Sequence, residues 1–169
     1  MELKRVVITG LGAITPLGND VATTWENAKA GVSGAGPITH FDASLFKTQF
    51  ACEVKGFKAE DHFDRRKARQ LDLYAQYALV AARQAVADAG LDAEGADIDK
   101  NRIGVIVAAG IGGLHTFEEE AGYYALNADK GPKYNPFFIP KMIADIASGH
   151  ISMEYGYHGP NYGVVSACA

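Results

Sequence analysis

Cysteine and long apolar runs are scarce in this 169-residue sequence. It has two cysteines, Cys52 and Cys168, which are too few for the disulfide framework of a small secreted protein and too far apart for a close-set metal motif. We therefore expect free thiols in a reducing cytoplasm. Glycines and a proline interrupt the apolar run that follows Arg5 long before it reaches a membrane-spanning length. We expect no signal peptide, no transmembrane helix and no membrane partner.

Positive charge is not in excess either. The 16 lysines and arginines are outnumbered by 20 aspartates and glutamates, which gives a net charge of -4 at pH 7. This balance provides no general electrostatic reason to bind nucleic acid, so any basic site must be local. Apolar residues make up 48% of the sequence, which suits one globular domain with a core of its own.

Hydrophobic patterning predicts alternating strands and helices. We expect strands at residues 3–9, at 102–110 and from 161 onward, and a small strand within 49–57. The strand at 102–110 is almost continuously apolar and is expected to be covered on both faces. Helices are expected at 20–31, capped by Asn19 or Asp20 and ended by Gly31, at 64–90, and at 137–156, where Pro140 stands in the first turn of a buried helix. This order predicts an α/β fold with parallel crossovers, whose chemistry lies at the carboxyl ends of the strands.

The helix expected at 64–90 has the clearest pattern. An apolar stripe rich in alanine runs along it, made of Leu71, Tyr74, Ala75, Ala78, Leu79, Ala82 and Val86, and Gly90 ends it. Its first turns are basic, with Arg65, Arg66, Lys67 and Arg69, although positive charge at a helix start is unfavourable with respect to the helix dipole. The cluster is either a solvated helix face or a landing patch for an acidic or phosphorylated partner, because guanidinium groups pair bidentately with carboxylates and phosphates.

Two glycine clusters follow expected strands. "GLGAIT" at 10–15 lacks the third glycine of the dinucleotide-binding fingerprint, and we interpret it as a structural turn. "GIGG" at 110–113 either lines a ligand pocket or lets a helix and a strand approach closely. His115, His150 and His158 stand at no metal-ligand spacing and are interpreted as structural or surface histidines, and the acidic run 118–120 as a solvated patch. We expect no metal site.

Cys168 is a candidate nucleophile. It closes a strand of the layered pattern, at the edge where helix N-termini gather. Most buried cysteines serve only as small apolar residues, and thiolate chemistry requires a pKa that a helix N-terminus or a histidine has lowered. From the residues alone both interpretations stay open.

The sequence resembles a known family in five stretches that follow one another in the family's order. They are "VVITGLGAITPLGND", "DLYAQYALVAARQAVADAGL", "RIGVIVAAGIGGL", "NPFFIPKMIADIASGHISMEYGYHGPN" and "YGVVSACA". The family is that of the elongating β-ketoacyl-acyl carrier protein synthases, condensing enzymes of fatty-acid synthesis, and the resemblance is closest to type II.

The resemblance implies that residues 1–169 form the N-terminal half of a thiolase-like layered αβαβα fold with a mixed, largely parallel sheet, cut just after the nucleophile and without the C-terminal half. Cys168 then accepts an acyl chain from acyl carrier protein as a thioester, and a malonyl group on a second carrier loses carbon dioxide and attacks it. The histidines and the lysine that assist come from the absent half, so we expect the fragment alone to show little or no condensation activity. The substrates travel on phosphopantetheine, and no cofactor is implied. Family members pair as homodimers through the strand that ends at the nucleophile.

Further positions take roles from the same resemblance. Ile111 resembles the gate of the acyl pocket, and Phe137 and Phe138 match an aromatic pair near that pocket and the dimer contact. Arg65, Arg66 and Arg69 resemble the basic surface that docks acyl carrier protein, with Lys130 and Lys133 as weaker candidates, while Gln70 replaces a residue that is often basic in relatives.

Two other functions compete with this interpretation. A non-catalytic partner of a condensing enzyme has the same fold but usually lacks the nucleophile, so Cys168 disfavours it. A nucleotide-binding α/β domain is disfavoured by the incomplete glycine fingerprint.

Overall fold

A computed structural model of the chain describes residues 3–167, and Cys168 lies outside the described residues. These residues fall into two compact units, one made of residues 3–58 and 80–93 and the other of residues 59–79 and 94–167. Helix α3 (Leu73–Asp88) contributes its first turns to the second unit and the remainder to the first. Among the described residues, no helix is both long enough and apolar enough to cross a bilayer.

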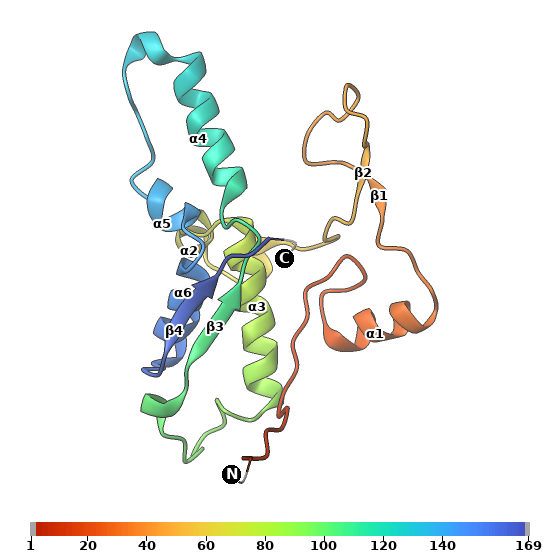
Figure 1. Cartoon of the computed structure of the whole chain (residues 1–169), viewed down its shortest axis with the longest axis vertical. Coiled ribbons are helices and arrows are strands. Elements are labelled where there is room, and N and C mark those ends of the chain that lie inside the picture. Colours follow the sequence, from red (N-terminus) through yellow and green to blue (C-terminus); the bar gives the residue numbers. More distant parts are fainter. Residues whose placement is uncertain (1–2, 168–169) are drawn as a thin grey trace. The chain divides into compact units, whose positions relative to one another are not determined.

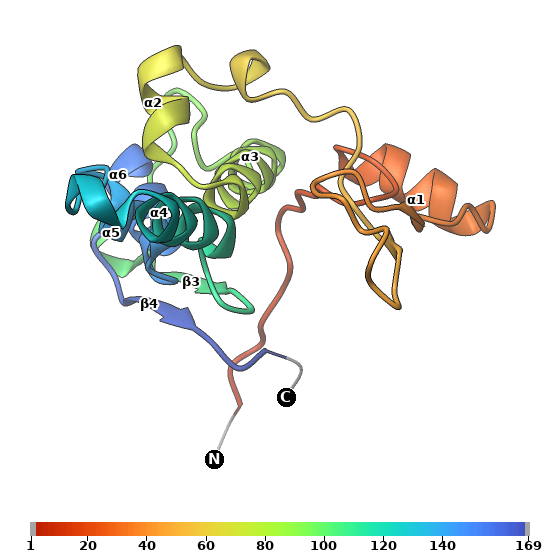
Figure 2. The ribbon, with the colours of Figure 1, turned by 90° about the horizontal axis from the view of Figure 1, so that it is seen from above.

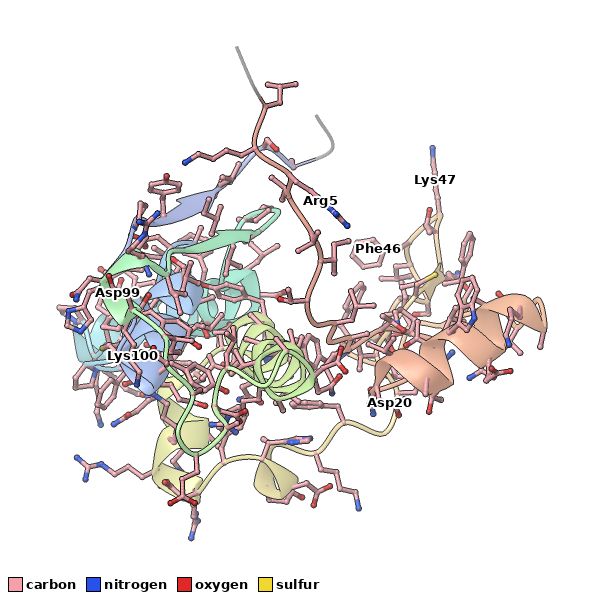
Figure 3. All side chains as sticks on the ribbon, turned by 90° about the horizontal axis from the view of Figure 1, so that it is seen from below. Arg5, Asp20, Phe46, Lys47, Asp99 and Lys100 are labelled. Carbon is pink, nitrogen blue, oxygen red and sulfur yellow. The ribbon has the colours of Figure 1, made fainter. Side chains whose placement is uncertain are left out.

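The first unit contains α1 (Val21–Lys29) and a small antiparallel ribbon of β1 (Gly36–Pro37) and β2 (Phe50–Ala51). Asp20 caps α1, because its Oδ1 accepts a hydrogen bond from the Thr23 backbone N–H at 2.7 Å, and Gly31 follows the helix with φ +69°. The predicted cap at Asp20, which Figure 3 labels, is therefore confirmed, as are the stop at Gly31 and the small strand. No residue of α1 is buried, and Trp25 is 62% exposed, so the expected apolar face of this helix is not covered.

The strand predicted at residues 3–9 is wrong. This segment, on which Figure 3 labels Arg5, forms no strand, and Val6 and Ile8 are 90% and 83% exposed. A strand is stabilised by hydrogen bonds to a neighbouring strand, and no strand within residues 3–167 pairs with this segment. The sequence has strand character here, but the partner that would fix it is not among these residues.

The loop "GLGAIT" packs against the last turns of α3. A Cβ atom at Gly12 would overlap the Ala81 carbonyl oxygen, and one at Gly10 would overlap that of Ala85. The Leu11 backbone N–H donates to Asp88 Oδ2 at 2.9 Å. These contacts confirm the interpretation as a structural turn, because close packing explains both glycines.

The second unit holds two parallel strands joined by a helical crossover (Figure 1). Its helices are α2 (Arg65–Gln70), the start of α3, α4 (Leu114–Leu126), α5 (Phe138–Met142) and α6 (Ile146–Tyr155), and its strands are β3 (Val105–Ala108) and β4 (Asn161–Val164). Three short 3-10 turns lie at Ala59–Asp61, Lys100–Arg102 and Ala128–Lys130. Val105 pairs with Asn161 and Ala108 with Val164, so the predicted parallel crossover is confirmed.

One face of this strand pair is covered by helices. Figure 2 shows α4, α5 and α6 on the same side of β3 and β4, and α6 contacts both strands. Side chains of β3 are alternately half-buried and exposed, and Ile106 is 62% exposed. The prediction that this strand is covered on both faces is wrong for the described residues, because helices cover only one face.

Two predicted helices are each divided in the structure. The helix at 64–90 breaks at Leu71, whose backbone is extended (φ -114°, ψ 134°), and the helix at 137–156 breaks at Ile143 (ψ 136°). The stripe nevertheless supplies much of the core of the unit, where Leu71, Ala75 and Leu79 are at most 3% exposed. Helix α4 was not predicted, since three consecutive glutamates obscured the apolar spacing of Leu114, Phe117 and Tyr124.

Candidate functional site

The carboxyl ends of β3 and β4 lie at the same edge of the sheet. The Ala109 N–H donates to the Val164 carbonyl at 2.9 Å, so the "GIGG" loop and residues 165–167 leave the sheet side by side. Ala167 has φ +46°, in the left-handed region that residues with a Cβ atom seldom adopt. The chain therefore turns sharply one residue before Cys168, which itself lies outside the described residues.

The "GIGG" loop approaches the end of α5 closely. Gly112 has φ +105°, and a Cβ atom there would lie 2.6 Å from the Met142 carbonyl oxygen. The Gly113 N–H donates to that same oxygen at 2.9 Å. The glycines permit a close approach of two backbones, and Gly113 also lines a cavity. The close approach of helix and strand segments is thus confirmed, and the role of the loop in a ligand pocket stays a prediction.

That cavity is apolar and has a volume of about 430 Å³. Its lining has no charged side chain and consists of Ile111, Gly113, Leu114, Phe117, Met142, Ile143 and Ala144. A volume of this size is within the range of small-molecule sites in proteins. Ile111, which the family resemblance matches to the gate of an acyl pocket, is one of the lining residues.

The carboxylate of Asp72 is buried beside Gly113, one of the residues that line this cavity. Helix α4 begins after Gly113, which has no side chain to cap it, and the cap comes instead from Asp72, which is only 5% exposed. Asp72 Oδ2 accepts from the Thr116 N–H at 3.0 Å and from the Thr116 hydroxyl at 2.6 Å, and Oδ1 accepts from the Tyr74 N–H at 3.2 Å. One negative charge thus serves the positive N-terminal ends of both α3 and α4.

Tyr74 contacts the wall of the same cavity that is formed by Met142, Ile143 and Ala144. Its hydroxyl donates to the Ile143 carbonyl at 2.5 Å, in the connection between α5 and α6. Burial, together with the negative charges of Asp72 and Asp145, raises the pKa of Tyr74 to about 12. The hydroxyl therefore remains a protonated donor at physiological pH.

A second pocket, with a volume of about 590 Å³, brings predicted residues together. Its lining is basic and polar with one aromatic ring, and consists of Arg65, Arg66, Arg69, Gln70, Asn135 and Phe137. Asp64 caps α2 by accepting from the Lys67 N–H at 2.8 Å, which places a negative charge at this basic helix start. Guanidinium groups gathered around a pocket are suited to carboxylate or phosphate ligands.

Asn135 is fixed at the rim of this basic pocket. Its backbone N–H donates to Glu120 Oε2 at 3.0 Å, and its Oδ1 accepts from the Phe137 N–H at 2.9 Å. The carboxylate of α4 therefore holds the loop that carries Phe137.

The structure separates Phe137 from Phe138. Phe138 belongs to a row of rings, 6.3 Å from Phe117 and stacked on Tyr134 at 5.6 Å. Lys130 Nζ donates to Asn127 Oδ1, and Lys133 borders another pocket beside Glu119 and Glu120. Neither lysine lines the basic pocket. Their proposed role in docking, like those of the arginines and aromatic residues, stays a prediction.

The three histidines take part in local contacts. His115 Nε2 lies 3.4 Å from Glu119, one turn along α4, and the His158 N–H donates to the Lys100 carbonyl, whose position Figure 3 labels. Lys67 Nζ donates to His150 Nδ1 at 3.3 Å, and burial together with the Lys67 charge lowers the pKa of His150. Residues 3–167 hold no cluster of histidine, cysteine and acidic residues that could bind a metal ion.

Sequence reasoning missed the residues that hold the two cavities in shape. Asp72 and Asn135 begin two of the stretches quoted for the family resemblance but received no role, and Thr116 lies outside those stretches. The hydroxyl of Tyr74 was hidden in an apolar stripe. An aspartate two residues after the basic turn is a signal for a new helix start, and it could have indicated the break at Leu71.

Comparison with known proteins shows which family this chain belongs to. The profile described as "Beta-ketoacyl synthase, N-terminal domain" matches residues 3–169. The chain is 50% identical over 167 residues to "3-oxoacyl-[acyl-carrier-protein] synthase 2" of Staphylococcus aureus (strain N315), covering 98% of this chain and 39% of that protein. The chain thus spans about two fifths of the length of this curated relative.

Solved structures are similar as well. "The ishigamide ketosynthase/chain length factor" is 30% identical with a TM-score of 0.82, and the match covers 96% of this chain and 40% of that one. A ketosynthase complex titled "AntDE:AntF (apo): type II PKS acyl-carrier protein in complex with its ketosynthase bound to the hexaketide" is 27% identical with a TM-score of 0.70, covering 92% of this chain and 40% of that one. The helical crossover and parallel strands described above are those of the thiolase-like ketosynthase fold.

Proposed function

Because this chain belongs to the beta-ketoacyl synthase N-terminal domain family, we propose that it is the N-terminal part of a 3-oxoacyl-acyl carrier protein synthase of fatty-acid elongation. The observation that carries the proposal is its 50% identity over 167 residues to a protein of that name. The arrangement of the sheet edge supports it, since the strand leading to Cys168 ends beside an apolar cavity that an acyl chain could occupy.

The proposed reaction has two stages. The Cys168 thiolate attacks the carbonyl of an acyl thioester on acyl carrier protein, the carrier leaves as a thiol, and the acyl group remains on sulfur. Malonyl on a second carrier then loses carbon dioxide, and the resulting carbanion attacks the acyl-Cys168 carbonyl. A 3-oxoacyl group forms on the carrier, and the Cys168 thiolate is released.

Several residues of this chain support that chemistry. The backbone N–H of Cys168 would stabilise the thioester oxyanion, while the resemblance assigns the assisting histidines and lysine to a part of the longer protein that follows this chain. Ile111 lies in the wall of the acyl cavity, and the acyl chain would extend past it towards Phe117. No cofactor is required, because the carrier's phosphopantetheine brings both substrates.

The basic pocket is the proposed docking site of acyl carrier protein. Arg65, Arg66 and Arg69 are exposed on α2, and an acidic carrier or its phosphate would pair with their guanidinium groups. A solved neighbour is a ketosynthase in complex with such a carrier. We place the enzyme in the cytoplasm, in keeping with its free thiols and carrier-bound substrates.

We also propose a homodimer that pairs through β4. Tyr162, Val164 and Val165 are 51%, 45% and 54% exposed, and within residues 3–167 no strand other than β3 pairs with β4. An apolar edge strand of this kind is suited to pairing with a second copy of the chain.

A non-catalytic partner is the second candidate. One similar structure pairs a ketosynthase with a chain length factor, and the two roles differ in whether the cysteine becomes acylated.

Acylation of the 169-residue protein distinguishes a condensing enzyme from a non-catalytic partner. We expect decanoyl-acyl carrier protein to add the mass of one acyl group to the 18.0 kDa chain, detected by intact-protein mass spectrometry. Cys52→Ala is the matched control, since Cys52 is exposed and should not accept the acyl group, whereas Cys168→Ala should abolish the mass increase. An unchanged mass, or an increase that persists in Cys168→Ala, would contradict the proposal.

A further inference from the structure

The segment from Asp72 to Tyr74 contacts both walls of the apolar cavity. Asp72 holds the first turn of α4 through Thr116, on the wall that carries Leu114 and Phe117. Tyr74 holds the Ile143 carbonyl, on the wall that carries Met142 and Ala144. Asp72, just before α3, and Tyr74, in its first turn, therefore join the two sides of the cavity.

The contacts between Asp72 and Thr116 are shielded from water, and the contact between Tyr74 and Ile143 is half-buried. Thr116 is 2% exposed and Asp72 is 5% exposed, so water does not readily replace the hydrogen bonds between them. The Ile143 carbonyl lies at the extended break between α5 and α6, where no helix continues to fix it. This carbonyl also accepts from the Ile146 N–H at 3.3 Å, so the Tyr74 hydroxyl makes the shorter of its two hydrogen bonds.

The two walls also contact each other at one end. The Gly113 N–H donates to the Met142 carbonyl at 2.9 Å, which closes the cavity near the sheet. Between Met142 and Ala144, the Ile143 carbonyl is held to the start of α3 by the Tyr74 hydroxyl. Loss of that hydroxyl should therefore loosen the wall at Ile143, while Met142 and Ala144 stay against the glycine loop.

We infer that Asp72, Tyr74 and Thr116 form a bracket that sets how long an acyl chain the cavity accepts. The inference rests on the proposed function, because it takes the cavity to be the acyl site. These are positioning residues: within the described residues none of the three lines the cavity, and each acts through the wall that it holds. Acyl-chain length would thus be determined in part by residues that do not themselves line the cavity.

The test is a change in chain-length preference rather than in overall affinity. The 169-residue protein carries Cys168→Ala, which prevents acyl transfer. Isothermal titration calorimetry then gives the Kd of hexanoyl-, decanoyl- and tetradecanoyl-pantetheine. In Tyr74→Phe we expect the preference for tetradecanoyl over hexanoyl to rise by at least about threefold, the equivalent of one lost hydrogen bond of ordinary strength. Thr116→Val should shift the preference as well, while Thr116→Ser, which keeps the hydroxyl, should not.

Tyr124→Phe is the matched control, since it removes a hydroxyl from a tyrosine that is 39% exposed on α4 and does not line the cavity. Near-ultraviolet circular dichroism of each variant shows whether it is folded. A preference that is unchanged in folded Tyr74→Phe, or that shifts equally in Tyr124→Phe, overturns the inference.

Failure of the inference and failure of the proposed function give different results. If decanoyl is transferred to Cys168 but the bracket variants keep the original preference, the function stands and the bracket is wrong. If no thioester binds the parent protein, the cavity is not an acyl site in this chain and the bracket has no role in selectivity. If the preference shifts but Cys168 is never acylated, the bracket stands and the catalytic proposal falls.

Discussion

Gly112 and Gly113 occupy positions where a side chain does not fit. Gly112 has φ +105°, and a Cβ atom there would lie 2.6 Å from the Met142 carbonyl oxygen. We expect Gly112→Ala to lower the free energy of unfolding by about 2 kcal/mol or more, from backbone strain and the displaced contact. Urea denaturation followed by circular dichroism measures the change.

Gly110→Ala provides the matched control within the same loop. A Cβ atom at Gly110 would meet nothing within 4 Å, and its φ is outside the left-handed region. This variant should stay within about 1 kcal/mol of the parent. Equal losses in the two variants would mean that the loop tolerates no side chain for some reason other than the approach of Met142.

The joint between α6 and β4 depends on one amide side chain. Asn161 Nδ2 donates to the Ser148 carbonyl at 2.9 Å and to Ser152 Oγ at 2.6 Å, and its Oδ1 accepts from Ser148 Oγ at 2.9 Å. Ser148 is fully buried, and its hydroxyl also donates to the Asp145 carbonyl at 2.8 Å, so the cost of losing Asn161 comes from its three hydrogen bonds. We expect Asn161→Ala to lower the free energy of unfolding by about 2 kcal/mol.

Asn127→Ala is the control for this joint. Its amide also donates to a backbone carbonyl, that of Tyr123, but at the exposed end of α4. Its loss should cost about 0.5 kcal/mol, because water replaces the hydrogen bond. A small effect of Asn161→Ala in urea denaturation would show that the strand is held by its backbone pairing with β3 alone.

The molecule as a whole should acylate without condensing. We expect the 169-residue protein, given decanoyl- and malonyl-acyl carrier protein, to hold the acyl group on Cys168 and to release no 3-oxoacyl product. His115 contacts Glu119, and His150 accepts a hydrogen bond from Lys67. The chain also covers only 39% of the relative named 3-oxoacyl-[acyl-carrier-protein] synthase 2. Mass spectrometry of the carrier measures the product.

A chain extended to the length of the curated relatives should carry out condensation. Product formation by the 169-residue protein at a rate similar to that of a protein of the relatives' length would show that the first part suffices. It would also assign the assisting groups to residues within this chain.

Local features of the fold could be predicted from the sequence. The cap at Asp20, the stop at Gly31 and the strand around Val105 depend on neighbours within a few residues, and the structure has all three. The segment at 3–9 could not be judged in this way, because a strand requires a partner that local pattern does not reveal.

The candidate site was predictable only in part. The sequence placed Ile111 beside the end of a strand and gathered three arginines on one helix, since both depend on local order. Its resemblance to a family pointed to Cys168, which lies outside the described residues. The separation of Phe137 from Phe138 follows from how α5 packs against α4, which no local pattern specifies.

The sequence by itself determined the α/β order of elements, the family and the residue that is proposed to carry the acyl group, because each depends on contiguous motifs. Only the tertiary structure decided that Asp72 caps a helix that begins 42 residues later and that Tyr74 holds the opposite wall of the cavity. The physical reason is that a buried polar group must find its hydrogen-bond partner in space. Packing of the whole unit selects that partner.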